Sequence, residues 1–147
     1  MEEALTELGK YGNISFEEFQ RDLSLRWIVE KGIEILIQNL LDIGAHLLAF
    51  QIKNDWEDYG ELILKPGKHR VIPQAFSDKI NGMAGLRNIL IHGYLKIDLD
   101  KLFDYLKVRL EDFVLFIKYI REYQKSSLKE RIIKVVCRRR SMNELFR

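Results

Sequence analysis

One long stretch of helical periodicity limits the folds that this chain can adopt. From residue 16 to about residue 52, apolar side chains recur at the spacing that places them on one face of an α-helix. The recurring residues are Phe19, Leu23, Trp27, Ile33, Leu36, Leu40, Ile43, Leu47 and Phe50. Because strand-type alternation is scarce and the chain has only 2 prolines, we expect an all-α fold built around this segment.

Capping signals indicate where the first helices begin and end. Ser15 followed by Glu18 has the pattern of a capping box, so a helix should start near Ser15. A break near Asp22 is plausible, because Asp-Leu-Ser offers another cap. The stretch 53–72 loses the period and contains glycine and proline, so we expect a loop there, with one short helical turn at 59–64.

A second long helix is expected from Pro73 to about His92. Proline suits the first turn of a helix, and Gly93 fits a C-terminal cap. Asp98 or Asp100 can then cap a third long helix.

The third helix should end near Tyr123 and be followed by a final helical stretch at 128–136. We therefore expect an antiparallel bundle of about four to five helices over residues 1–123, with a basic helical extension over 124–147. The last 23 residues hold eight Lys or Arg against two acidic residues, although the whole chain has a net charge of only +2. Such a tail can bind nucleic acid or be a solvated terminal helix.

The composition favours a cytoplasmic protein. Cys137 is the only cysteine, so no disulfide can form within the chain. The N-terminus begins with acidic residues rather than a basic patch, unlike a signal peptide. The longest apolar stretch is interrupted by Glu34, Gln38 and Asp42, so we expect no membrane span.

The segment RNILIHGY, residues 87–94, places polar side chains within an apolar helical pattern. Arg87 falls in the middle of the apolar stripe, which is costly unless its guanidinium finds a partner. Arg87 and His92 project about 140° apart on an ideal helix. One straight helix cannot aim both at one point, whereas a two-fold pairing of two copies could bring them to one groove.

A purely structural interpretation of the same residues remains open. His92 could interact with the last carbonyls and the negative end of the helix dipole. Arg87 could extend its charged head to solvent. Tyr94 could be a core aromatic with a solvated hydroxyl.

Other polar residues are weaker candidates. His46 could be a core or groove histidine, and Asp42, one turn earlier, could pair with it or reach Arg87 from a neighbouring helix. The basic segment KPGKHR at 65–70 could touch RNA phosphates or be a solvated turn. With no glycine-rich phosphate loop and no His-Glu-x2-His motif, we expect neither a cofactor nor a bound metal.

The stretch GMAGLRNILIHGY resembles the Arg-x4-His-x-Tyr signature of the HepT toxins, a branch of the HEPN superfamily of helical ribonucleases. The signature falls on Arg87, His92 and Tyr94, and Asn88 also looks like the family. The resemblance covers roughly residues 15–123. The segment before it looks shorter than the family's first helix, and the basic extension after it looks longer than usual.

The resemblance implies a metal-independent endoribonuclease that acts on RNA as a homodimer. Histidine can move protons near neutral pH and arginine can grip phosphate, so His92 is assigned proton transfer and Arg87 transition-state stabilisation. Asn88 would orient His92 or bind the phosphate. Such toxins are typically paired with an MNT-type nucleotidyltransferase antitoxin that adenylylates the motif tyrosine, here Tyr94.

Two other functions compete with this one. The chain could be a non-catalytic HEPN-like module that binds a nucleotide or a partner nucleotidyltransferase. It could also be a structural bundle in which the motif arose by chance. RNA cleavage that persists in EDTA would favour the enzyme.

Overall fold

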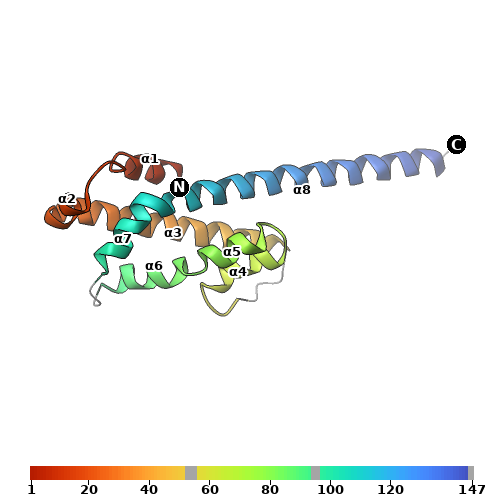
Figure 1. Cartoon of the computed structure of the whole chain (residues 1–147). Helices are drawn as coiled ribbons and strands as arrows, with labels where there is room; N and C mark the ends of the chain where they lie inside the picture. The colour runs from red at the N-terminus through yellow and green to blue at the C-terminus, as the bar shows by residue number, and fades with distance from the viewer. Residues whose placement is uncertain (52–55, 94–96, 146–147) are drawn as a thin grey trace.

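The computed structural model describes residues 1–51, 56–93 and 97–145, and it describes side chains within these ranges as far as residue 130 except at 50 and 51. Every regular element in these ranges is helical, which confirms the all-α class. More helices are present there than the four to five expected. They are α1 (Glu2–Gly9), α2 (Phe16–Arg21), α3 (Leu23–Gln51), α4 (Glu61–Lys68), α5 (Gln74–Ile80), α6 (Met83–His92), α7 (Leu99–Asp104), the π-helical turn η1 (Tyr105–Arg109) and α8 (Leu110–Leu145) (Figure 1).

The long helix α3 is the axis of the bundle. Helix α6 packs along α3 in the opposite direction, so the C-terminal end of α6 lies near the N-terminal part of α3 (Figure 1). Helix α8 leaves the bundle as a single rod (Figure 1). The expected end near Tyr123 was wrong, because α8 continues to Leu145 and its sequence contains neither glycine nor proline to stop it.

The expected caps are present at the helix ends. Ser15 and Glu18 form a complete capping box at the start of α2, and the pKa of Glu18 is lowered by the hydrogen bond from the Ser15 backbone amide. Asp22 accepts a hydrogen bond of 3.0 Å from the Leu25 amide, so the long helix is broken where the sequence indicated. Asp98 accepts from the amides of Asp100 and Lys101 and caps α7.

Two of the expected element boundaries were wrong. The segment expected to be mostly loop contains α4, which includes Pro66 and buries Leu62 and Ile63 against the core. The buried Ser77 hydroxyl donates to the Ile63 carbonyl at 2.7 Å and joins α5 to α4. The helix expected over 73–92 is divided into α5 and α6 by a turn at 81–82.

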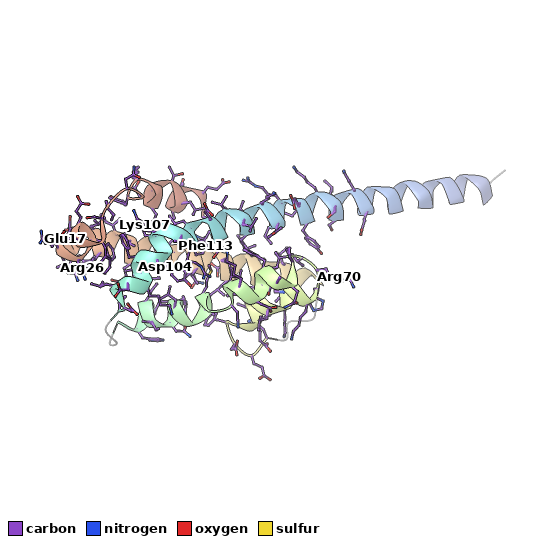
Figure 2. The ribbon with its side chains drawn as sticks, in the orientation of Figure 1. Glu17, Arg26, Arg70, Asp104, Lys107 and Phe113 are labelled. Carbon is purple, nitrogen blue, oxygen red and sulfur yellow. The ribbon has the colours of Figure 1, made fainter. Side chains whose placement is uncertain are left out.

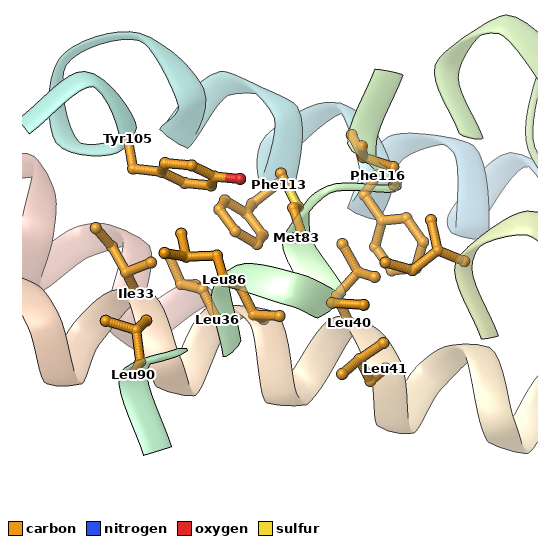
Figure 3. Close-up of a cluster of buried hydrophobic side chains, with 14 of the residues drawn as sticks. Ile33, Leu36, Leu40, Leu41, Met83, Leu86, Leu90, Tyr105, Phe113 and Phe116 are labelled. Atoms are coloured by element: carbon orange, nitrogen blue, oxygen red, sulfur yellow. The ribbon is translucent and has the colours of Figure 1, made fainter. Parts of the chain in front are cut away.

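A single apolar core lies between α3, α6 and the start of α8 (Figure 3). Its central side chains are at most 5% exposed: Ile33, Leu36, Leu40, Leu41, Met83, Leu86, Leu90, Tyr105, Phe113 and Phe116. The apolar period that predicted the first long helix therefore corresponds to the buried face of α3 at Ile33, Leu36 and Leu40, whereas Leu23 and Trp27, in the first turns of α3, are 49% and 63% exposed.

Polar contacts fix the helices around this core. Asp112, only 3% exposed, pairs with Lys79 Nζ at 2.5 Å and with Arg109 Nε at 2.6 Å, which links α5 to α8. Lys107 in η1 donates to the Ile14 carbonyl at 2.9 Å and ties this turn to the segment before α2 (Figure 2).

Helix α3 is long and apolar enough over Leu23–Ala49 to cross a membrane by length and composition, which differs from the expectation. Its buried side chains form the core described above, while Gln38 and Asp42 interrupt the outer face. This amphipathic burial is the pattern of a core helix.

Gly44 tests the contact between α3 and α4. A Cβ at Gly44 would lie 2.6 Å from the Leu62 carbonyl oxygen, so Gly44→Ala must push the two backbones apart. We expect the free energy of unfolding to fall by about 1–3 kcal/mol, measured by urea denaturation. Gly9→Ala is the control, because nothing lies within 4 Å of its Cβ position. Equal stability of the two variants would contradict this packing.

Candidate active site

Helix α6 carries the polar segment and ends immediately after it. Gly93 has φ = 55°, in the left-handed region, and its amide donates to the Ile89 carbonyl at 3.3 Å. Any residue other than glycine is strained in this conformation, so the left-handed turn that ends α6 requires a glycine at position 93. His92 therefore lies in the last turn of α6, where it is exposed to solvent.

Arg87 spans the contact between α6 and α3. Its guanidinium donates two hydrogen bonds to one oxygen of Gln38, from Nε at 3.1 Å and from Nη2 at 2.9 Å. The same guanidinium lies over the Tyr59 ring, with 4.5 Å from Cζ to the ring centroid. A cation over an aromatic face contributes on the order of 1 kcal/mol at such partly exposed sites.

Asp42 fixes the orientation of the Gln38 amide. The Gln38 Nε2 group donates to Asp42 Oδ1 at 2.8 Å, so the amide oxygen faces Arg87, which can only donate. The hypothesis that Asp42 reaches Arg87 was therefore wrong, because Gln38 lies between them. Asp42 acts through Gln38, and the three side chains form one chain of hydrogen bonds.

The charge of Arg87 is held without being neutralised. Among the described residues, no carboxylate forms an ion pair with its guanidinium, and the partners are an amide oxygen and an aromatic ring. A neutral acceptor positions the side chain while leaving a full positive charge. Such a half-buried cation is suited to an anionic ligand such as phosphate.

The other predicted site residues, Asn88, His92 and Tyr94, differ in how far the structure defines their contacts. Asn88 Oδ1 lies 3.5 Å from Arg87 Nη1, so its contact is with the arginine and not with His92. No hydrogen bond involves the His92 ring within the described part of the chain. Tyr94, predicted as a supporting and modified residue, lies outside the described residues.

The sequence pattern did not single out Gln38 and Tyr59 as partners of Arg87. Gln38 belongs to a polar row on α3 with a spacing of four residues, Glu34, Gln38, Asp42 and His46, which could have indicated a groove. Tyr59 precedes α4 and offers no such signal.

The structure also defines the positions of two weaker candidates, His46 and the basic segment 65–70. His46 is exposed on α3. Lys65 lies in α4 rather than in a loop, and it pairs with Glu61 at 3.1 Å. Within residues 1–51, 56–93 and 97–145, no group of three His, Cys, Asp or Glu residues is arranged to hold a metal ion.

Comparison with known sequences identifies relatives of this chain. A family model described as Ribonuclease HepT-like matches residues 1–120, and this match includes α1, which the resemblance had left out. A tRNA nuclease HepT of Aphanizomenon flos-aquae is 26% identical over 119 residues, or 81% of each chain. An mRNA nuclease HepT of Shewanella oneidensis is 29% identical over 111 residues, covering 76% of this chain and 82% of that protein.

Two solved structures share the fold. One is the tri-AMPylated HEPN toxin of Shewanella oneidensis in complex with its MNT antitoxin, with a TM-score of 0.71 and 27% identity. The other is a toxin–antitoxin structure with AMP-PNP, with a TM-score of 0.72 and 26% identity. Each match covers 81% of this chain and 92% of the other.

Gln38→Ala tests whether Gln38 holds Arg87. The substitution removes the acceptor of two hydrogen bonds, so the Arg87 Nε–H should exchange faster with water in heteronuclear NMR spectra. Asn39→Ala is the matched control, because the Asn39 amide donates to the Ile35 carbonyl instead. Equal protection of the Arg87 Nε–H in both variants would show that Gln38 does not position it.

Proposed function

Because the chain belongs to the HepT-like ribonuclease family, we propose that it is the RNA-cleaving toxin of a toxin–antitoxin pair. The observation that carries the proposal is the pairing, on one short helix, of an un-neutralised Arg87 and an exposed His92. A structural bundle has no use for a charge that is oriented by Gln38 and Tyr59 but left without a counter-ion.

The proposed reaction is an internal transesterification of RNA. A histidine accepts the proton of the 2′-OH, O2′ attacks phosphorus, and the bond from phosphorus to O5′ breaks. A second proton donor protonates O5′, so the products are a 2′,3′-cyclic phosphate and a 5′-OH end. Arg87 binds the phosphate oxygens, whose charge grows in the phosphorane, and needs no metal to do so.

A homodimer would complete this site. Arg87 and His92 project about 140° apart on α6, and one histidine cannot both accept and donate a proton in the same concerted step. A second copy would supply the other His92. Part of the α6 surface is open to such a partner, since Gly85 has no atom within 4 Å of its Cβ position and Ile91 is 41% exposed.

The second proposed partner is an MNT-type nucleotidyltransferase antitoxin. The related Shewanella oneidensis toxin is AMPylated in complex with such an antitoxin, and the motif tyrosine here is Tyr94, two residues after His92. An adenylyl group at Tyr94 would place bulk and negative charge where an RNA phosphate must bind. Cleavage would then be blocked by sterics and by charge repulsion.

Substitution of the two site residues tests the catalytic proposal. We expect His92→Ala and Arg87→Ala each to lower the rate of RNA cleavage by about 100-fold or more, because each removes a proton-transfer group or a phosphate-binding cation. Cleavage by the parent should persist in EDTA. Arg21→Ala, at an exposed arginine of α2 that pairs with Glu17, is the control. A parent protein that binds nucleotide but never cleaves RNA would favour the non-catalytic module.

Mixed dimers test whether the site is composite. Differently tagged copies allow the purification of dimers that contain one intact subunit and one His92→Ala subunit. If both histidines act in one groove, the mixed dimer should retain far less than half of the parent activity. Half of the parent activity would mean that each subunit works alone.

Intact-mass spectrometry tests the modification. Protein produced together with an MNT-type nucleotidyltransferase antitoxin should carry adenylyl groups and lose cleavage activity. Tyr94→Phe should remain active under the same conditions, because it has no hydroxyl at the modified position. Full inactivation of Tyr94→Phe would place the controlling modification elsewhere.

A further inference from the structure

A pocket of about 480 Å³ adjoins the end of α6. Its walls include Arg26, Trp27 and Glu30 from α3, the helix-ending Gly93, and Leu99 at the start of α7. Arg26 lies in the part of α3 that follows α2 (Figure 2). Because α6 runs opposite to α3, this pocket lies beyond the His92 end of α6 and on the side away from Gln38.

Trp27 presents a free aromatic face at this pocket. Its side chain is 63% exposed, the largest exposed fraction among the large hydrophobic side chains of the described residues. Trp27 and Gln38 are eleven positions apart on α3, so they lie within about 20° of each other around the helix and about 16 Å apart along it. The indole therefore shares a surface with the Gln38–Arg87 contact. Every nucleic-acid base has a flat face that can stack on such a ring.

Arg26 supplies an unsatisfied donor at the same pocket. Its Nε atom is buried and, within the described residues, has no hydrogen-bond partner. Glu30, one turn along α3, does not pair with it, as no ion pair of the described residues includes either side chain. Because no carboxylate of the described residues neutralises the Arg26 guanidinium, its charge remains available to an anionic oxygen in the pocket.

Glu30 adds an acceptor of different character. Burial, followed by the nearby charge of Glu34, raises the pKa of its carboxyl. A carboxylate repels phosphate, but it accepts hydrogen bonds from the exocyclic amino group of a base. The pocket thus combines a stacking surface, a cation for phosphate and an acceptor for a base edge.

We propose that this pocket is a nucleotide subsite of the RNA-binding surface, in which a base a few nucleotides from the cleaved phosphate stacks on Trp27 and a neighbouring phosphate pairs with Arg26. Glu30 favours bases that carry an exocyclic amino group. This inference rests on the proposed ribonuclease function and adds to it the residues that select a nucleotide near the scissile bond.

Fluorescence of Trp27 tests the subsite directly. Trp27 and Trp56 are the two tryptophans, so Trp56→Phe leaves Trp27 as the only indole reporter. Titration of the full-length dimer with a single-stranded oligonucleotide that lacks the 2′-OH at the scissile position should quench this fluorescence without cleavage. Because the readout is binding, it remains informative if the protein cuts no RNA, which separates failure of the subsite from failure of the proposed function.

Kinetics of substituted proteins give the second readout. Trp27→Ala should raise KM on the order of ten-fold and leave kcat near the parent value, whereas Trp27→Phe should restore most of the loss. Arg26→Gln should weaken RNA binding. The salt dependence of the binding constant should correspond to about one fewer ion released than in the parent. Arg26→Lys should recover part of this binding. Arg21→Gln is the charge-matched control, because Arg21 is exposed on α2 and pairs with Glu17.

Three results would overturn the subsite. The first is unchanged fluorescence on oligonucleotide binding, together with an unchanged KM for Trp27→Ala. The second is dissociation of the Trp27→Ala dimer in size-exclusion chromatography, which would assign this face to a second copy of the chain. The third is quenching by ATP alone at an affinity equal to that of the oligonucleotide, which would identify a free nucleotide as the occupant.

Discussion

The contact between the Arg87 guanidinium and the Gln38 amide is the interaction on which the candidate site depends. It joins α6 to α3 at the edge of their apolar contact, at a position in the apolar stripe of α6 where leucine would be the ordinary choice. Burying part of a charge costs free energy, and a neutral acceptor returns only part of it. The presence of Arg87 at this position, despite that cost, is most simply explained by a ligand that binds its charge.

The end of α6 determines what lies next to this charge. Gly93 stops the helix in a conformation that favours glycine, so His92 stands in the last turn with its ring in solvent. The antiparallel packing of α6 on α3 then places the Gly93 end near Arg26 and Trp27, while Arg87 lies at the level of Gln38. Arg87, the exposed His92 and the exposed Trp27 therefore lie at successive levels along the N-terminal half of α3.

The elements that the sequence predicted correctly are those with local signals. The capping box at Ser15 and the aspartate caps at 22 and 98 satisfy amide groups within a few residues of themselves, and each is present. Only a short helical turn at 59–64 was expected where α4 lies, because its glycine and proline favour a loop locally, whereas burial of Leu62 and Ile63 stabilises a longer helix. The break at 81–82 was missed because an apolar period can continue across a short turn.

The sequence by itself determined the all-α class, the identity of Arg87 and His92 as the unusual residues, and the glycine that ends their helix. These depend on periodicity, composition and the backbone freedom of one residue, which are local properties. Only the tertiary structure decided that Arg87 is held by Gln38, 49 positions away, and by Tyr59, and that Asn88 contacts Arg87 instead of His92. These contacts depend on the position of α6 along α3, which is set by the packing of the two helices against each other and not by a property of either helix alone.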